Sequence, residues 1–216
     1  MNRQRGLLIG GGILLLIAVV MGIAATNNNT SVKKGREKEV NYAELYLDRY
    51  IYGNFEDKPE IEFSDVPSDF SVVVGPLKEK IQSDTKLSNE QIDKLFELYY
   101  ESVKQKTSFD ANLKKTKKNS FTYTVGISGI SLKELSKNLK ETEKGDDVYL
   151  YFSNVISQNK SSNEQTSVDL TFKKENGKIS LASNYMAVVK LYMAFYIGET
   201  DVFSIKKMME EFQPAK

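Results

Sequence analysis

The feature that most constrains this chain of 216 residues is a hydrophobic run near its start. Residues 6–25 are Gly, Leu, Ile, Ala, Val and Met only, without one charged or polar side chain. A helix rises about 1.5 Å per residue, so the run covers roughly 30 Å, the hydrocarbon thickness of a bilayer. A helix lying on a soluble core would carry a polar face, and this segment has none. We therefore predict a transmembrane helix over residues 6–25.

The orientation of that helix rests on the placement of the flanking charges. Arg3 and Arg5 lie directly before the run, whereas four basic side chains follow it within residues 33–38. A count of both sets does not decide the topology, because charges within about 15–20 residues of the helix all contribute. The polar residues 26–31 hold the later charges away from the membrane, and a short basic start is the layout of an export signal. We therefore expect the C-terminal domain to be extracytoplasmic.

The hydrophobic run also divides the chain into segments. Gly22 and Ala24 form a small-x-small pair that would permit signal cleavage, but the run exceeds the usual signal core of roughly 7–15 residues, which favours retention. The expected organisation is a short basic N-terminus at 1–5, the membrane helix at 6–25, a polar basic stalk at 26–40 and one soluble domain at 41–216. Its length suits a single domain with a substantial core.

Two missing residue types exclude much chemistry. The chain contains no cysteine and no histidine. Disulfides, thiolate nucleophiles and Ser-His-Asp or Cys-His catalysis are therefore ruled out, and an ordinary zinc site is not expected. We predict no catalytic, cofactor-binding or metal-binding residues, no cofactor and no enzymatic activity.

Periodicity and capping signals predict the elements of the soluble domain. Ser88 and Gln91 form a capping box before an apolar stripe at helical spacing, and Asn176-Gly177 is the strongest short hairpin signal. Helices are expected at 41–52, 88–106, from 131 onward, 146–157, 185–196 and 205–212; strands are expected at 121–128, 166–172 and from 179; and 58–82 is expected to be irregular, with a short strand at 71–74 and a short helix after Pro76. This order predicts an α+β fold with helices packed on a small antiparallel sheet.

Three stretches resemble a known family. These are YAELYLDRYIYGNFED at 42–57, FTYTVGISGISLKEL at 121–135 and SVDLTFKKENGKISLAS at 167–183. They resemble a domain-of-unknown-function group of Gram-positive extracytoplasmic domains, found mostly in lipoproteins. The resemblance implies a nuclear-transport-factor-2-like or cystatin-like fold and brings no catalytic residues. Lipoproteins of that group carry a lipid-bearing cysteine, which this chain lacks, so its anchoring would come from the helix itself.

Charged residues offer candidate sites that we weigh against simpler readings. Glu60 with Glu62, or Asp146 with Asp147, could in principle hydrolyse a glycoside, but no spacing singles them out from surface turn residues. The aspartate pair also lacks the ligand spacing of a calcium loop. Six lysines between the predicted helix and strand make a basic stretch that we interpret as a solvated connection: Lys104, Lys106, Lys114, Lys115, Lys117 and Lys118. Residues 39–216 hold 24 basic and 28 acidic side chains, so we expect no nucleic acid partner.

Tyrosines could line a ligand pocket or fill the core. They occur at helical spacing, which favours the core: Tyr42, Tyr46, Tyr50, Tyr52, Tyr99 and Tyr100. The function we expect is a membrane-anchored extracytoplasmic binding or interaction domain of a bacterial cell envelope, which contacts an envelope protein or a small ligand. The alternative is a structural subunit of an envelope-spanning conjugation or secretion complex.

Overall fold

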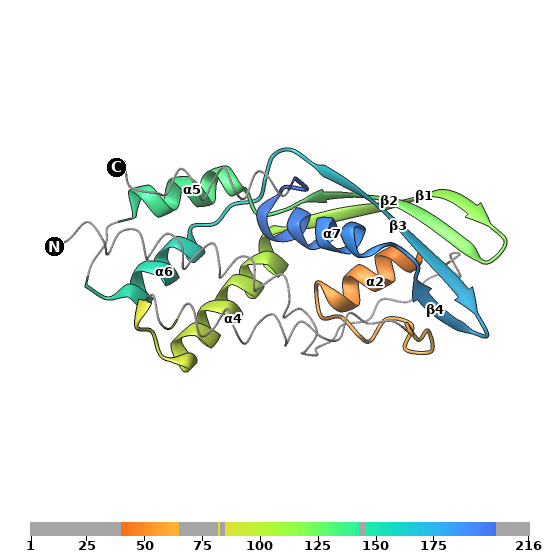
Figure 1. Cartoon of the computed structure of the whole chain (residues 1–216), viewed down its shortest axis with the longest axis horizontal. Helices are drawn as coiled ribbons and strands as arrows, with labels where there is room; N and C mark the ends of the chain where they lie inside the picture. Colours follow the sequence, from red (N-terminus) through yellow and green to blue (C-terminus); the bar gives the residue numbers. More distant parts are fainter. Residues whose placement is uncertain (1–39, 65–81, 83–84, 143–145, 202–216) are drawn as a thin grey trace.

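A computed structural model describes residues 40–64, 82, 85–142 and 146–201 of the chain (Figure 1). The predicted membrane helix at 6–25, most of the stalk, the short strand at 71–74, the helix after Pro76 and the helix at 205–212 lie outside the described residues. Among the helices that are described, none has the length and apolarity to cross a bilayer. The described elements are α2 (Tyr42–Tyr50), α4 (Asn89–Lys106), β1 (Ser108–Lys117), β2 (Ser120–Ser128), α5 (Leu132–Glu141), α6 (Val148–Ser157), β3 (Thr166–Glu175), β4 (Lys178–Leu181) and α7 (Tyr185–Ile197). The predicted α+β class is confirmed.

The four strands form one antiparallel sheet in the order β1-β2-β3-β4. Two hairpins join neighbouring strands, and β2 pairs with β3 in a register that sets Phe121 opposite Phe172. The turn between β3 and β4 has positive φ at Asn176 (51°) and Gly177 (82°), the conformation that this dipeptide adopts in tight hairpins. The hairpin predicted from Asn176-Gly177 is confirmed.

One face of the sheet is apolar and the other is polar. Along β2, Tyr123, Val125 and Ile127 are buried. Helix α2 packs on this apolar face through Tyr46, whose ring lies 5.6 Å from that of Phe172. Helix α7 packs on it through Phe195, whose ring lies 6.1 Å from that of Phe109. Aromatic rings therefore pack between these two helices and the sheet, and Figure 1 shows α2 and α7 lying beside the strands.

Capping residues fix where the helices begin. The capping box at Ser88 and Gln91 is present as expected, with both reciprocal hydrogen bonds made. Asn41 caps α2 through its side-chain oxygen, which accepts from the Glu44 N–H at 3.1 Å. Helix α7 ends at Gly198, which adopts the left-handed conformation with φ 65°.

The C-terminal end of α7 crosses the short segment that connects β2 to α5. The Ile130 N–H donates to the Phe195 carbonyl at 2.9 Å. A side chain at Gly129 would place its Cβ 1.7 Å from the Ala194 carbonyl oxygen, so only glycine fits there. This crossing joins the end of the fold to its middle.

The structure corrects the prediction of a solvated connection through the lysine-rich stretch. Residues 108–117 form strand β1, which pairs with β2 along its full length. The alternation of Phe109, Ala111 and Leu113 with polar residues was hidden, because β1 lies at the sheet edge and most of its side chains are exposed. A bulge between Leu113 and Lys115 further breaks the period of two.

Helix α2 also carries a buried charged side chain, that of Arg49. Arg49 is 5% exposed. Its guanidinium donates to three backbone carbonyls of the loop that follows α2, those of Asp57 (2.8 Å), Lys58 (2.5 Å) and Ile61 (2.5 Å). The loop folds over the helix and buries the charge, which a periodicity argument cannot anticipate.

Candidate functional site

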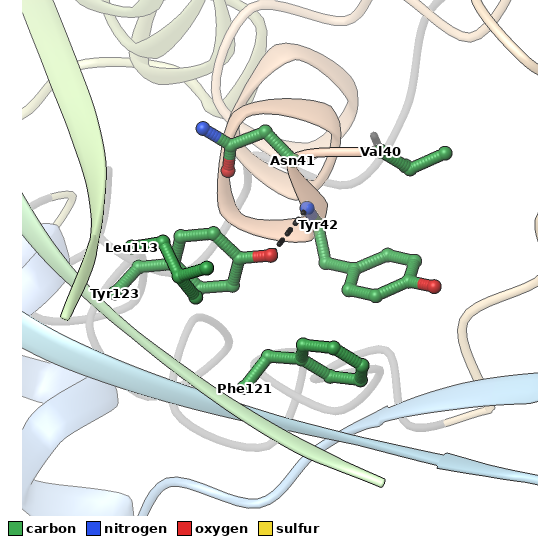
Figure 2. A pocket seen from close by; sticks show the side chains of 6 residues that line it. All are labelled: Val40, Asn41, Tyr42, Leu113, Phe121 and Tyr123. Carbon is green, nitrogen blue, oxygen red and sulfur yellow. Dashed lines mark hydrogen bonds between the residues drawn. The ribbon is translucent and has the colours of Figure 1, made fainter. Parts of the chain in front are cut away.

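A shallow groove lies where the start of α2 meets the β1–β2 hairpin (Figure 2). Its floor is aromatic: the Tyr42 ring lies edge-on to Phe121, with 5.1 Å between the ring centroids. The Tyr42 N–H donates to the Tyr123 hydroxyl at 3.3 Å, which ties the helix to the strand beneath it. We call this the aromatic groove; it is lined by Val40, Asn41, Tyr42, Leu113, Phe121 and Tyr123.

The size of the aromatic groove limits what it can hold. Its volume is about 240 Å³, whereas pockets for whole drug-sized ligands run from roughly 300 to 1,000 Å³. Leu113 stands at its rim with 50% of the side chain exposed. The groove therefore suits one or two apolar side chains of a partner better than a complete metabolite.

The edge strand β1 borders the aromatic groove. Within the described residues β1 pairs with β2 alone, so its outer edge carries no further strand. Asn41 reaches this edge and donates from Nδ2 to the Ala111 carbonyl at 2.8 Å. Beyond that contact, the edge beside Leu113 offers backbone groups that an extended peptide could pair with.

A wider and flatter depression lies on the polar face of the sheet, against the start of α7. Its volume is about 550 Å³. Asp169 accepts from Lys114 Nζ at 2.6 Å and from the Thr124 hydroxyl at 2.7 Å, and these two hydrogen bonds lower the pKa of the carboxyl. Because the Asp169 carboxylate is already bonded to Lys114 and Thr124, few polar groups of this depression are free to orient a ligand.

The carboxylates considered from the sequence do not converge on a site. Glu62 forms an exposed ion pair with Lys178 at 3.2 Å, and Glu60 is exposed. Asp147 caps α6 by accepting from the Leu150 N–H at 3.0 Å, while Asp146 lies exposed beside it. In the part of the chain that the structure describes, no group of three or more acidic side chains is placed to hold a metal ion.

Three of the six lysines in the basic stretch bind partners within the fold, and the other three are exposed near the β1–β2 turn. Lys104 pairs with Glu101 at 2.8 Å. Lys106 donates to the carbonyls that close α6, including that of Asn159 at 2.7 Å. Lys114 pairs with Asp169 as described, and Lys115, Lys117 and Lys118 are exposed toward the β1–β2 turn. The stretch is thus not one basic surface.

The tyrosines belong mainly to the core, as their spacing predicted. Tyr42, Tyr46, Tyr50 and Tyr99 are buried, whereas Tyr52 and Tyr100 are half-buried. Burial raises the pKa of Tyr46 above its ordinary value, and it raises the pKa of Tyr100 to about 12. Tyr42 has both roles, because its buried ring also lines the aromatic groove.

One perturbed carboxyl was not singled out by the sequence. Burial, with a smaller contribution from the nearby carboxylates of Glu44 and Asp57, raises the pKa of Asp48 on α2 to about 6. A helical position at the border of an apolar stripe is its only sequence signal. Repulsion among these three carboxylates lowers the stability of the fold when all are ionised. Within the described residues, nothing else marks this acidic group as a binding site.

Comparisons with known proteins support the fold. No family model matches the chain, and no curated protein matches it either. Among solved structures, the chain is similar to the crystal structure of a "putative lipoprotein (ycdA)" from Bacillus subtilis, with a TM-score of 0.50 and 14% identity. The match covers 71% of this chain and 54% of that one, so this chain spans about half the length of its structural neighbour. At this identity the likeness shows a shared α+β fold with a Gram-positive protein described as a lipoprotein.

Proposed function

We propose that this chain is a membrane-anchored, extracytoplasmic interaction module that binds an extended segment of a cell-envelope protein at the aromatic groove. The observation that carries the proposal is the pairing of that groove with the open edge of β1. A strand added to β1 would form backbone hydrogen bonds, and its alternate side chains would point toward Leu113 and the aromatic floor. The proposal includes no catalytic role.

The proposed location at the cell envelope rests on the sequence and on the similarity in fold to the solved lipoprotein structure. The hydrophobic run at 6–25 would supply the anchor, and the stalk would connect it to Val40 at the groove. A structural neighbour described as a lipoprotein supports an envelope location for this fold. We propose in addition that the fold is of the nuclear-transport-factor-2 or cystatin type, which the antiparallel sheet with helices on its apolar face supports.

A structural subunit of a conjugation or secretion complex would use the same anchor and remains the second candidate. Such a subunit has to assemble with copies of itself or with similar subunits. The outer edge of β1 carries Lys115 and Lys117, and lysines along an edge oppose pairing with a second identical edge. This charge pattern favours a different partner over self-assembly at β1.

The binding proposal is tested by site-specific crosslinking in living cells. A photoreactive amino acid at Leu113 is expected to capture one protein reproducibly, because this side chain stands at the groove rim. Leu150 on α6 is the matched control, since its exposure of 55% is close to the 50% of Leu113. Purified full-length protein should then bind the captured partner, and Leu113→Lys should weaken binding about tenfold or more, as for a hot-spot residue.

Three results would reject parts of this proposal. Equal capture from Leu113 and Leu150 would mean that the groove is not the binding surface, as would unchanged binding by Leu113→Lys. Crosslinks made only between two copies of the chain would favour the structural subunit. For the address, protease added to intact cells stripped of their wall should digest the domain; protection until lysis would reverse the orientation.

A further inference from the structure

Lysines from two hairpins far apart in sequence meet at one end of the sheet. The β1–β2 turn and the β3–β4 turn lie at this end, and the Lys174 N–H donates to the Asn119 carbonyl at 2.8 Å between them. Lys117 and Lys173 both flank Ser120 in the register of the three strands. We call this end the lysine tip; its basic residues, all exposed, are Lys115, Lys117, Lys118, Lys173, Lys174 and Lys178.

Little of this charge is neutralised. Among the described residues of the β3–β4 turn and of the segment that pairs with β4, Glu175 and Glu62 are acidic, and Glu62 pairs with Lys178. Counted with these two carboxylates, the six lysines give the tip a net charge of +4. Within the described residues, none of the other five lysines forms an ion pair. The other described residues hold 12 basic and 18 acidic side chains, a net of −6. Charge is therefore unevenly distributed over the described residues, with the positive end at the two turns, which lie at the same end of the sheet in Figure 1.

The lysine tip also lies near the point where the domain is tethered. Val40, the first described residue, lines the aromatic groove together with Phe121, two residues beyond the β1–β2 turn. Residues 26–39 would join Val40 to the proposed membrane helix. A flexible chain of this length spans roughly 20 Å on average, with a limit of about 50 Å when fully extended. An anchored domain would thus keep its lysine tip within reach of the lipid surface.

We propose that the lysine tip docks on the anionic headgroups of the membrane that anchors the chain. Its lysines match the negative surface potential of anionic lipids, while the acidic remainder of the domain is repelled and turns away. Docking of the tip would orient the domain and hold the aromatic groove close to the bilayer. This inference rests on the proposed anchoring but not on a partner at the groove, so the two can fail separately.

The test uses the full-length protein in nanodiscs of zwitterionic lipid and in nanodiscs that contain phosphatidylglycerol. The chain has no tryptophan, so Thr116→Trp places a single probe on the tip, and Leu150→Trp on α6 serves as the control. The emission of the probe at position 116 is expected to shift to shorter wavelength in anionic discs only. The shift should disappear in 1 M salt, where the screening length falls to about 3 Å.

The charge requirement is tested by neutralising three lysines of the tip. Each lysine at an anionic surface contributes roughly a fivefold factor to docking, so the triple variant should weaken docking on the order of a hundredfold. The variant is Lys115→Gln, Lys117→Gln and Lys173→Gln. A control with the same loss of charge on α5, made of Lys133→Gln, Lys137→Gln and Lys140→Gln, should retain the shift.

Amine-reactive footprinting of the unmodified full-length protein provides a second readout that needs no substitution. The tip lysines should be protected in anionic discs and reactive in zwitterionic discs. Equal protection in both kinds of disc, or no response of the probe at position 116, would overturn the proposal. Stronger protection by soluble polyphosphate in zwitterionic discs than by anionic lipid would also overturn it, because the tip would then be a site for a free polyanion.

Discussion

Replacement of Arg49 by methionine tests whether a buried guanidinium holds the loop after α2 in place. Each hydrogen bond from a charged donor contributes about 1.5–3 kcal/mol, so three would contribute about 5–9 kcal/mol if they were independent. They are not independent, because the loop can turn its carbonyls to water and the Lys58 carbonyl also accepts from the Ile61 N–H at 3.0 Å. We therefore expect Arg49→Met to lower the free energy of unfolding by about 3 kcal/mol. Arg49→Lys should lose about 2 kcal/mol, since an ammonium lacks the planar fork that reaches several acceptors.

The assay is urea unfolding of the full-length protein in detergent, followed by far-ultraviolet circular dichroism. In a parallel thermal unfolding experiment, a loss of about 3 kcal/mol should lower the melting temperature by about 6–12 °C for a domain of this size. The control is Lys94→Met, because Lys94 forms an exposed ion pair with Glu90 at 2.7 Å, and fully solvated pairs contribute little to stability. If Arg49→Met destabilised the protein no more than Lys94→Met, the loop would not depend on these hydrogen bonds and the reasoning would be refuted.

Three further changes have definite expected outcomes. Asp48→Asn should leave the free energy of unfolding unchanged near pH 4, where the folded wild-type carboxyl is protonated, and should stabilise the protein increasingly from pH 4 to above pH 6. The gain should reach roughly 1–2 kcal/mol after allowance for solvent screening. Urea titrations across that pH range would measure it. Gly129→Ala should cost about 3 kcal/mol or more, or prevent folding, because its Cβ would overlap the Ala194 carbonyl; a melting temperature near that of the wild type would contradict the backbone crossing. Asn41→Ala should lose about 1–2 kcal/mol by removing both the cap and the bond to Ala111, whereas Asn41→Asp should recover the part due to the cap.

Local signals predicted the elements they control directly. The capping box at Ser88 and Gln91 and the turn at Asn176-Gly177 depend on residues adjacent in sequence, and both are present in the structure. Strand β1 was missed because an edge strand buries little, so its alternation is weak beside a run of lysines. The burial of Arg49 has no signal in the sequence, because its partners come from a loop whose path is set by tertiary packing.

The two candidate surfaces could not be predicted from the sequence, because each depends on tertiary contacts between distant residues. The aromatic groove joins Val40 and Tyr42 to Leu113 and Phe121, about seventy residues later in the chain, and no short-range pattern specifies that contact. The lysine tip similarly combines turns at 118–119 and 176–177. The sequence indicated the residue types present, whereas the sheet register determined which of them lie together.

Helix α7 has a consequence for the order in which this protein can be made. Every residue from Leu191 to Ile197 is buried, and the helix closes against the link at Gly129 and Ile130. A nascent chain that has not yet reached residue 185 lacks the central packing element against which the sheet and α2 are completed. We therefore expect the emerging polypeptide to stay loosely structured until then, with aromatic side chains exposed to a chaperone.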